Sequence, residues 1–94
     1  MKQIKHKLLY ILYVCLLLQA RRGYFTAQDL IKALNVGKST AYNIVSLLKR
    51  RELIEEVGSA LPGMYRLTRR SLRILYFFAL KTADALEIVA RKRR

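Results

Sequence analysis

The sequence predicts a mainly α-helical fold with one small β-hairpin, an α+β class. Apolar residues recur at helical spacing over most of the 94-residue chain. Residues 53–68 instead combine strand-forming residues with a cluster of turn residues. Because domains average about 100–200 residues, we expect a single domain over residues 1–94.

The charge of the chain is strongly one-sided. Nineteen Lys and Arg residues face six Asp and Glu, a formal net charge of +13. A small domain this basic repels itself, so the excess suits a polyanion such as nucleic acid or an anionic membrane. With one Cys and one His, we expect no internal disulfide and no zinc site. The scattered acids offer no nucleophile–base pair, so we expect no enzyme and no cofactor.

The first helix is expected over residues 3–20, with apolar residues nearly all round it. One stripe steps by four and three residues: Ile4, Leu8, Ile11, Cys15, Leu18. Leu9, Leu12 and Leu16 form a second stripe, which favours a helix buried on both sides. The alternative is a signal peptide or membrane anchor at residues 8–18. That run is shorter than the about 20 residues that span a bilayer.

Residues 27–51 are expected to form two short helices joined by a tight turn. Thr26 and Asp29 match a capping box that starts a helix at Ala27. Asn35-Val36-Gly37 ends this helix, and the next begins at Lys38. Its apolar face is Ala41, Val45 and Leu48, with Ile44 beside them. Such a unit is a helix-turn-helix, whose second helix lies in the DNA major groove.

The other face of the helix from Lys38 is polar and free of acidic residues. Asn43 can bond adenine, while Ser and Lys side chains can reach bases or phosphates. The same side chains could instead be merely solvated. Gly37-Lys38-Ser39-Thr40 resembles the end of a phosphate-binding loop, but Lys32 stands where that motif requires Gly.

The remaining residues predict a hairpin and a long helix. Strands at Leu53–Val57 and Met64–Leu67 flank a turn at Gly58–Gly63, and the hairpin must pack on something to be stable. Thr68 caps a helix over residues 69–91. Arg69, Arg70 and Arg73 in its first turns oppose the helix dipole, which suits phosphate contact.

Surplus apolar surface on the first and last helices predicts a two-fold homodimer. The alternative is that the two helices pair within one chain. If Cys15 lies near the two-fold axis, it could form an interchain disulfide. The predicted interface residues are Leu8, Ile11, Cys15, Leu18, Leu72, Tyr76, Ala79, Ala83 and Leu86.

From residue 26 to residue 68 the pattern resembles the winged helix-turn-helix superfamily of transcription regulators. It is similar to the ArsR, MarR and PadR groups and to small single-domain regulators of archaea, their viruses and plasmids. The resemblance implies a winged helix with long N- and C-terminal dimerisation helices. It places Lys38, Ser39, Thr40, Tyr42, Asn43 and Ser46 on DNA, with Arg66 and the turn at 58–63 as the wing. The turn carries no Lys or Arg, and a metal-sensing set is absent.

We therefore expect a cytoplasmic homodimer that binds double-stranded DNA sequence-specifically and regulates transcription. A nucleoid or architectural protein would share the fold but bind without sequence preference. A membrane-associated protein anchored by residues 8–18 is a third hypothesis, and a protein-interaction module that binds no nucleic acid is a fourth. The residues expected to contact DNA are Lys38, Ser39, Thr40, Tyr42, Asn43, Ser46, Lys49, Arg50, Arg66, Arg69 and Arg70.

Overall fold

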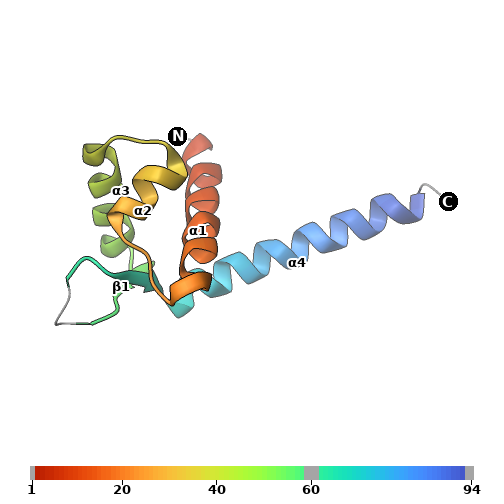
Figure 1. The fold of residues 1–94 in the computed structure, drawn as a ribbon. Coiled ribbons are helices and arrows are strands. Elements are labelled where there is room, and N and C mark those ends of the chain that lie inside the picture. The colour runs from red at the N-terminus through yellow and green to blue at the C-terminus, as the bar shows by residue number, and fades with distance from the viewer. Residues whose placement is uncertain (1, 59–61, 93–94) are drawn as a thin grey trace.

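A computed structural model describes residues 2–58 and 62–92 (Figure 1). Over these residues the chain forms four helices and one two-stranded antiparallel hairpin, which confirms the mainly α fold with a small hairpin. The helices are α1 (Lys2–Arg22), α2 (Ala27–Leu34), α3 (Lys38–Arg50) and α4 (Arg69–Lys92). The strands are β1 (Ile54–Glu56) and β2 (Tyr65–Leu67).

The connection from α1 to α2 is held by main-chain geometry and a cap. Gly23 has a φ of +86°, a left-handed conformation that ends α1 and suits glycine. Its amide donates to the carbonyl of Gln19 at 2.6 Å. At the start of α2, the Asp29 amide donates to Thr26 Oγ1 at 3.2 Å and the Thr26 amide donates to Asp29 Oδ2 at 2.9 Å. The predicted capping box is confirmed.

The turn between α2 and α3 is short and sharply bent. Asn35 ends α2 in the left-handed region with a φ of 54°, a conformation that Asn tolerates. From there α3 packs through the apolar face that its spacing predicts. Ala41, Val45 and Leu48 are all buried.

The hairpin is anchored to the body by a contact that the sequence did not predict. Its register pairs Ile54 with Leu67 and Glu56 with Tyr65. Phe25 forms an additional antiparallel bridge to Tyr65, with two main-chain hydrogen bonds of 2.8 Å. The Phe25 side chain is fully buried, which gives the hairpin the support it lacks alone. Of the predicted turn at 58–63, residues 59–61 lie outside the described residues.

The buried apolar residues of the core come from every element except α4. Its members are Leu12, Cys15, Phe25, Leu30, Val45, Leu48, Leu53, Ile54 and Leu67. The apolar residues that α4 adds are the partly buried Ile74 and Leu75 in its first two turns. Beyond them α4 runs out into solvent, and the molecule measures 55 × 26 × 22 Å (Figure 1).

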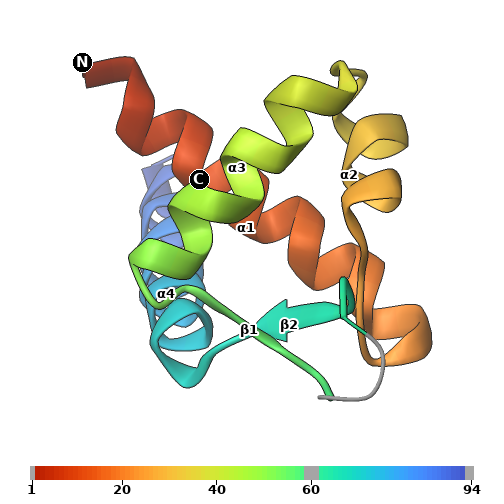
Figure 2. The same cartoon turned by 90° about the vertical axis from the view of Figure 1, so that its left-hand side faces the viewer.

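The two ends of the molecule are clearly separated. In Figure 2 α3 lies nearest the viewer with the hairpin below it, and α4 runs away behind the body. The exposed side of α3 and the far end of α4 therefore lie on opposite sides of the molecule.

Candidate nucleic-acid interface

The exposed face of α3 is polar, basic and free of acidic residues. Tyr42 is 51% exposed, and the neighbouring predicted residues on this face are exposed with it. These are Lys38, Ser39, Thr40, Asn43, Ser46, Lys49 and Arg50. Because Ala41, Val45 and Leu48 on the other side of the same helix are buried, one helix presents all of these groups to solvent.

Two of the predicted contact residues are already paired with carboxylates. Lys49 Nζ lies 3.0 Å from Glu56 Oε1, and Arg66 Nε lies 2.8 Å from Glu55 Oε2. The hydrogen bond to Glu56, and then its charge, raise the pKa of Lys49. The strands of the hairpin therefore bring two carboxylates, Glu55 and Glu56, and one cation, Arg66, to this edge of the site. Both pairs are exposed, and exposed pairs of this kind are easily exchanged for other partners.

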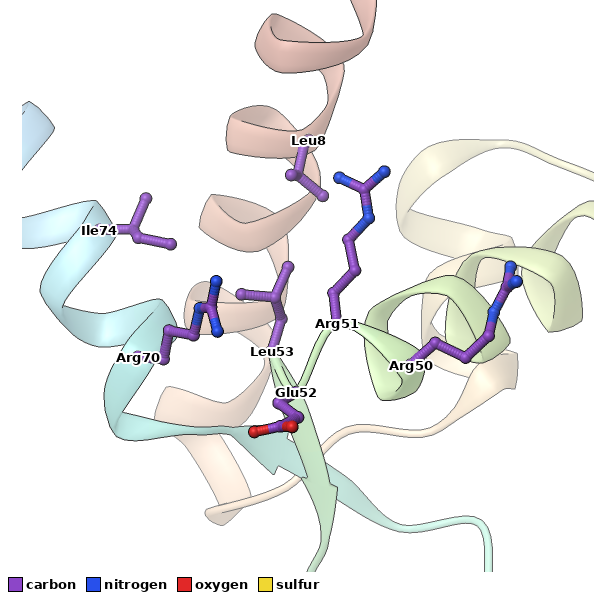
Figure 3. Close-up of a pocket in the computed structure, with 7 residues that line it drawn as sticks. All are labelled: Leu8, Arg50, Arg51, Glu52, Leu53, Arg70 and Ile74. Carbon is purple, nitrogen blue, oxygen red and sulfur yellow. The ribbon is translucent and has the colours of Figure 1, made fainter.

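A second basic group gathers where α3 ends and α4 begins. Arg50 and Arg51 come from the end of α3, and Arg69 and Arg70 from the first turn of α4; all four are exposed. Within residues 2–58 and 62–92, none of the four takes part in an ion pair. Arg50, Arg51 and Arg70 line one cleft of about 270 Å³ (Figure 3). The sequence predicted three of these arginines as contacts and missed Arg51.

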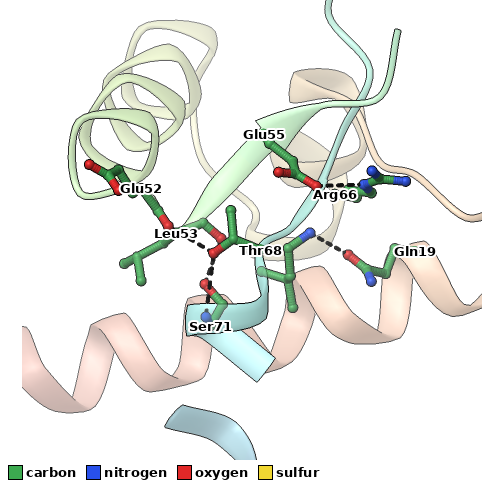
Figure 4. A network of polar contacts seen from close by, with 8 residues as sticks. Gln19, Glu52, Leu53, Glu55, Arg66, Thr68 and Ser71 are labelled. Carbon is green, nitrogen blue, oxygen red and sulfur yellow. Dashed lines mark hydrogen bonds and ion pairs between the residues drawn. The ribbon is translucent and has the colours of Figure 1, made fainter. Parts of the chain in front are cut away.

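A polar network holds the two arginine pairs in a fixed relation (Figure 4). Thr68 Oγ1 donates to the carbonyl of Glu52 at 2.8 Å and accepts a hydrogen bond from the Ser71 amide at 3.4 Å. The fully buried Ser71 hydroxyl donates to the carbonyl of Leu53 at 2.5 Å. These bonds tie the first turn of α4 to the chain that leaves α3. Sequence reasoning identified Thr68 as a cap but missed Ser71, because a lone Ser carries no burial signal.

The predicted interface residues on α1 need correction. Cys15 is fully buried in the core of the single chain, so it is neither an interface residue nor placed for an interchain disulfide. Leu8, Ile11 and Leu18 are partly buried and pack against the same core. Because α1 is apolar nearly all round, its periodicity could not tell which stripe faces inward.

The exposed apolar face of α1 is formed by other residues, which sequence reasoning missed. Tyr10, Tyr13 and Leu17 are 52–58% exposed. The sequence predicts a first helix that is buried on both sides. In the single chain, the side that carries Tyr10, Tyr13 and Leu17 is exposed to solvent.

The predicted interface residues on α4 are exposed, together with several neighbours. Tyr76 and Leu86 are 67% and 66% exposed, and Leu72, Ala79 and Ala83 are exposed too. Where α4 leaves α1, an open apolar cleft with a volume of about 530 Å³ lies between them. We call it the α1–α4 corner; its lining residues are Leu9, Tyr10, Tyr13, Leu75, Phe78, Ala79, Thr82, Ala83 and Leu86.

Three further findings bear on function. In the described part of the chain, no helix combines the length and apolarity needed to cross a bilayer. Over the same residues no three His, Cys, Asp or Glu side chains gather as metal ligands would. Comparisons with protein-family models, curated proteins and solved structures give no match.

Proposed function

We propose that the chain is a winged helix-turn-helix protein that binds double-stranded DNA sequence-specifically, as a homodimer, and regulates transcription. The observation that carries this proposal is the exposed face of α3, which is basic, free of acid and rigidly held from behind. The order of elements supports it, because a capped helix, a tight turn and a second helix lead directly into an antiparallel hairpin.

In this proposal α3 enters the major groove and the flanking cations hold the phosphates. Asn43 and Tyr42 lie on the exposed face and carry groups that read base edges. Lys38 at the start of α3 and Arg50 at its end reach the backbone, where counterion release supplies affinity. The hairpin contributes less than a basic wing would, because Glu55 and Glu56 offset Arg66 and Lys49.

The homodimer is inferred from the outer part of α4. Residues 79–92 extend beyond the body (Figure 1). Leu86 and Ile88 are more than half exposed there, and exposed apolar surface of this kind marks an interaction site. A second copy supplies a matching α4 and a matching α1–α4 corner, which is the self-complementary arrangement of a two-fold dimer. It leaves both α3 faces uncovered, because they lie on the opposite side of each protomer.

The test is anisotropy of the purified protein with a random duplex pool across a salt series, with the bound fraction sequenced. We expect a steep fall of affinity with salt and an enriched, roughly palindromic motif with half-sites about 34 Å apart. Asn43→Ala should reduce the base preference at one position of the motif by about 1–3 kcal/mol. Lys38→Gln should weaken binding to all sequences equally and lower the slope of log affinity against log salt by about 1. Lys81→Gln, on the outer part of α4, is the matched control.

Two outcomes would overturn the proposal. Tight, salt-dependent binding with no enriched motif would replace it with an architectural DNA-binding protein. Absence of binding at low salt would remove nucleic acid as the partner of this basic surface.

A further inference from the structure

Two adjoining cavities of different chemistry lie between the body and α4. The first is the cleft of about 270 Å³ that contains Arg51 and Arg70. The second, of about 290 Å³, is lined entirely by apolar residues, among them Leu9, Leu12 and Phe78. Leu8 and Ile74 line both cavities, so the charged cleft leads into the apolar one.

The charged cleft is arranged to receive an anion (Figure 3). In Figure 3 the Arg51 side chain extends from the end of α3 toward Leu8, and the Arg70 side chain extends from the start of α4 on the other side of Leu53. Arg50 points away along α3. The Glu52 carboxylate points in the opposite direction from the Arg51 guanidinium. Within the described residues neither Arg51 nor Arg70 has an ion-pair partner. Guanidinium groups bind carboxylates with two parallel hydrogen bonds.

The apolar lining of the second cavity indicates which chemical class of anion fits. A bare phosphate, or the backbone of DNA, would use the two arginines and leave the partly exposed Leu9 and Phe78 in water. A ligand with an apolar chain would cover that surface as well, and burial of apolar area is favourable. Ligand pockets of about 300–1,000 Å³ typically join a mostly apolar lining to a few polar groups that fix orientation. The two cavities together have that size and that composition.

We propose that this pair of cavities binds a small amphipathic carboxylate with an unbranched apolar chain, the class of a medium-chain fatty acid. The carboxylate lies between Arg51 and Arg70. The chain passes Leu8 and Ile74 and lies along Leu9 and Phe78.

The position of the ligand implies a regulatory effect, and this part rests on the proposed function. Arg51 follows α3, Leu9 and Leu12 belong to α1, and Arg70 and Phe78 belong to α4. One ligand therefore touches both the body that carries α3 and the helix that we assign to dimerisation. Occupancy would set the direction of α4 relative to the body, and with it the distance between the two α3 helices of a dimer.

The experiment is isothermal titration of the full chain, without DNA, with decanoate below its micelle-forming concentration. We expect one saturable site per protomer. Arg51→Gln and Arg70→Gln should each weaken binding about 10- to 100-fold, the effect of losing a hydrogen bond to a charged group. Lys81→Gln, an exposed charge change elsewhere on α4, should leave the affinity unchanged. Circular dichroism checks that each variant keeps its helices.

Two further ligands and one substitution separate the two halves of the site. Decanol, which lacks the charge, and acetate, which lacks the chain, should each bind at least about tenfold more weakly than decanoate. Phe78→Ala should weaken decanoate and leave acetate unchanged.

The opposite results would overturn the proposal in different ways. Equal binding of decanol and decanoate would remove the role of the arginines. Equal binding of acetate and decanoate would assign the arginines to a bare anion such as a DNA phosphate. Decanoate binding that disappears as self-association increases would assign the apolar cavity to a second copy. Because the titration contains no DNA, loss of this site and loss of the proposed DNA binding are recorded independently.

Discussion

The body of the protein and the outer part of α4 are both rich in apolar residues, yet they use them differently. In the body, Phe25, Leu30 and Leu48 are completely buried and form one core with residues from five elements. In α4, the large apolar side chains from residue 76 onward are 45–67% exposed: Tyr76, Phe77, Phe78, Leu80, Leu86 and Ile88. Composition alone does not distinguish the two regions; the direction of α4, away from the body, does.

The difference teaches that the two regions are stabilised differently. The body contains the buried contacts that hold its elements together, whereas Leu80, Leu86 and Ile88 in the outer part of α4 are exposed in the single chain. In the proposed homodimer, a second copy covers them. Substitutions can therefore affect one region and spare the other.

The largest effect is expected from Phe25→Ala. This substitution removes a fully buried ring that also packs on Tyr65, with the ring centres 6.1 Å apart. Phe→Ala in a core costs about 3–5 kcal/mol of unfolding free energy. Urea unfolding should show this loss equally at low and high protein concentration. A loss confined to high concentration would place Phe25 at an interface and contradict the account of the body.

Leu86→Arg should act on the dimer and spare the body. A charge placed in a buried interface without a partner is strongly unfavourable, so we expect the dimer dissociation constant to rise at least about 100-fold, near 2.7 kcal/mol. Sedimentation equilibrium measures the constant, and the matched control is Ser46→Arg, which adds the same charge at an exposed position on α3. An unchanged dimer would show that α4 does not form the interface.

Cys15 offers a test based on pH. Burial raises the pKa of its thiol from 9.0 to about 12 in the folded protein. The folded state thus keeps a proton that the unfolded state releases above pH 9, and its stability is lost as the pH rises from 9 toward 12. The slope approaches about 1.4 kcal/mol per pH unit.

The matched measurement uses urea unfolding of the native chain and of Cys15→Ala between pH 7.5 and 10.5. The difference in unfolding free energy between them should shrink above pH 9, because the variant has no thiol to ionise. A difference that stays constant with pH would mean that Cys15 is not enclosed by the core.

The smallest effect is expected from Glu56→Gln, which tests whether the hairpin restrains DNA binding. The substitution frees Lys49 and lets its pKa fall back toward the ordinary value, with little change in stability. One additional free cation should tighten DNA binding roughly two- to tenfold at low salt. Glu87→Gln adds the same net charge on α4 and should leave affinity almost unchanged. Equal gains in both variants would show that only total charge matters.

Much of the fold could be predicted from the sequence because its signals are local. The capping box at Thr26 and Asp29 depends on four consecutive residues, and the buried face of α3 on spacing within one helix. The exposed face of α3 followed from the same spacing. Each of these features is decided within one or two helical turns.

The remaining features depend on residues that are far apart along the chain. Phe25 pairs with Tyr65, and Lys49 pairs with Glu56, only because the hairpin folds back beside α1 and α3. The inward stripe of α1 is ambiguous from sequence because apolar residues surround that helix. The sequence therefore predicts Cys15 at an interface, whereas the structure buries it in the core. The pairing of Arg51 with Arg70 in one cleft likewise requires α4 to start beside the end of α3.

Hydrogen exchange at several protein concentrations tests the central claim most directly. If the body folds alone and the outer part of α4 folds on a second copy, amides of α3 should be protected at every concentration. Amides of residues 79–92 should gain protection only as the dimer forms, and Leu86→Arg should abolish that gain without affecting α3. Protection of residues 79–92 that is independent of concentration, or equal in Leu86→Arg, would contradict the account.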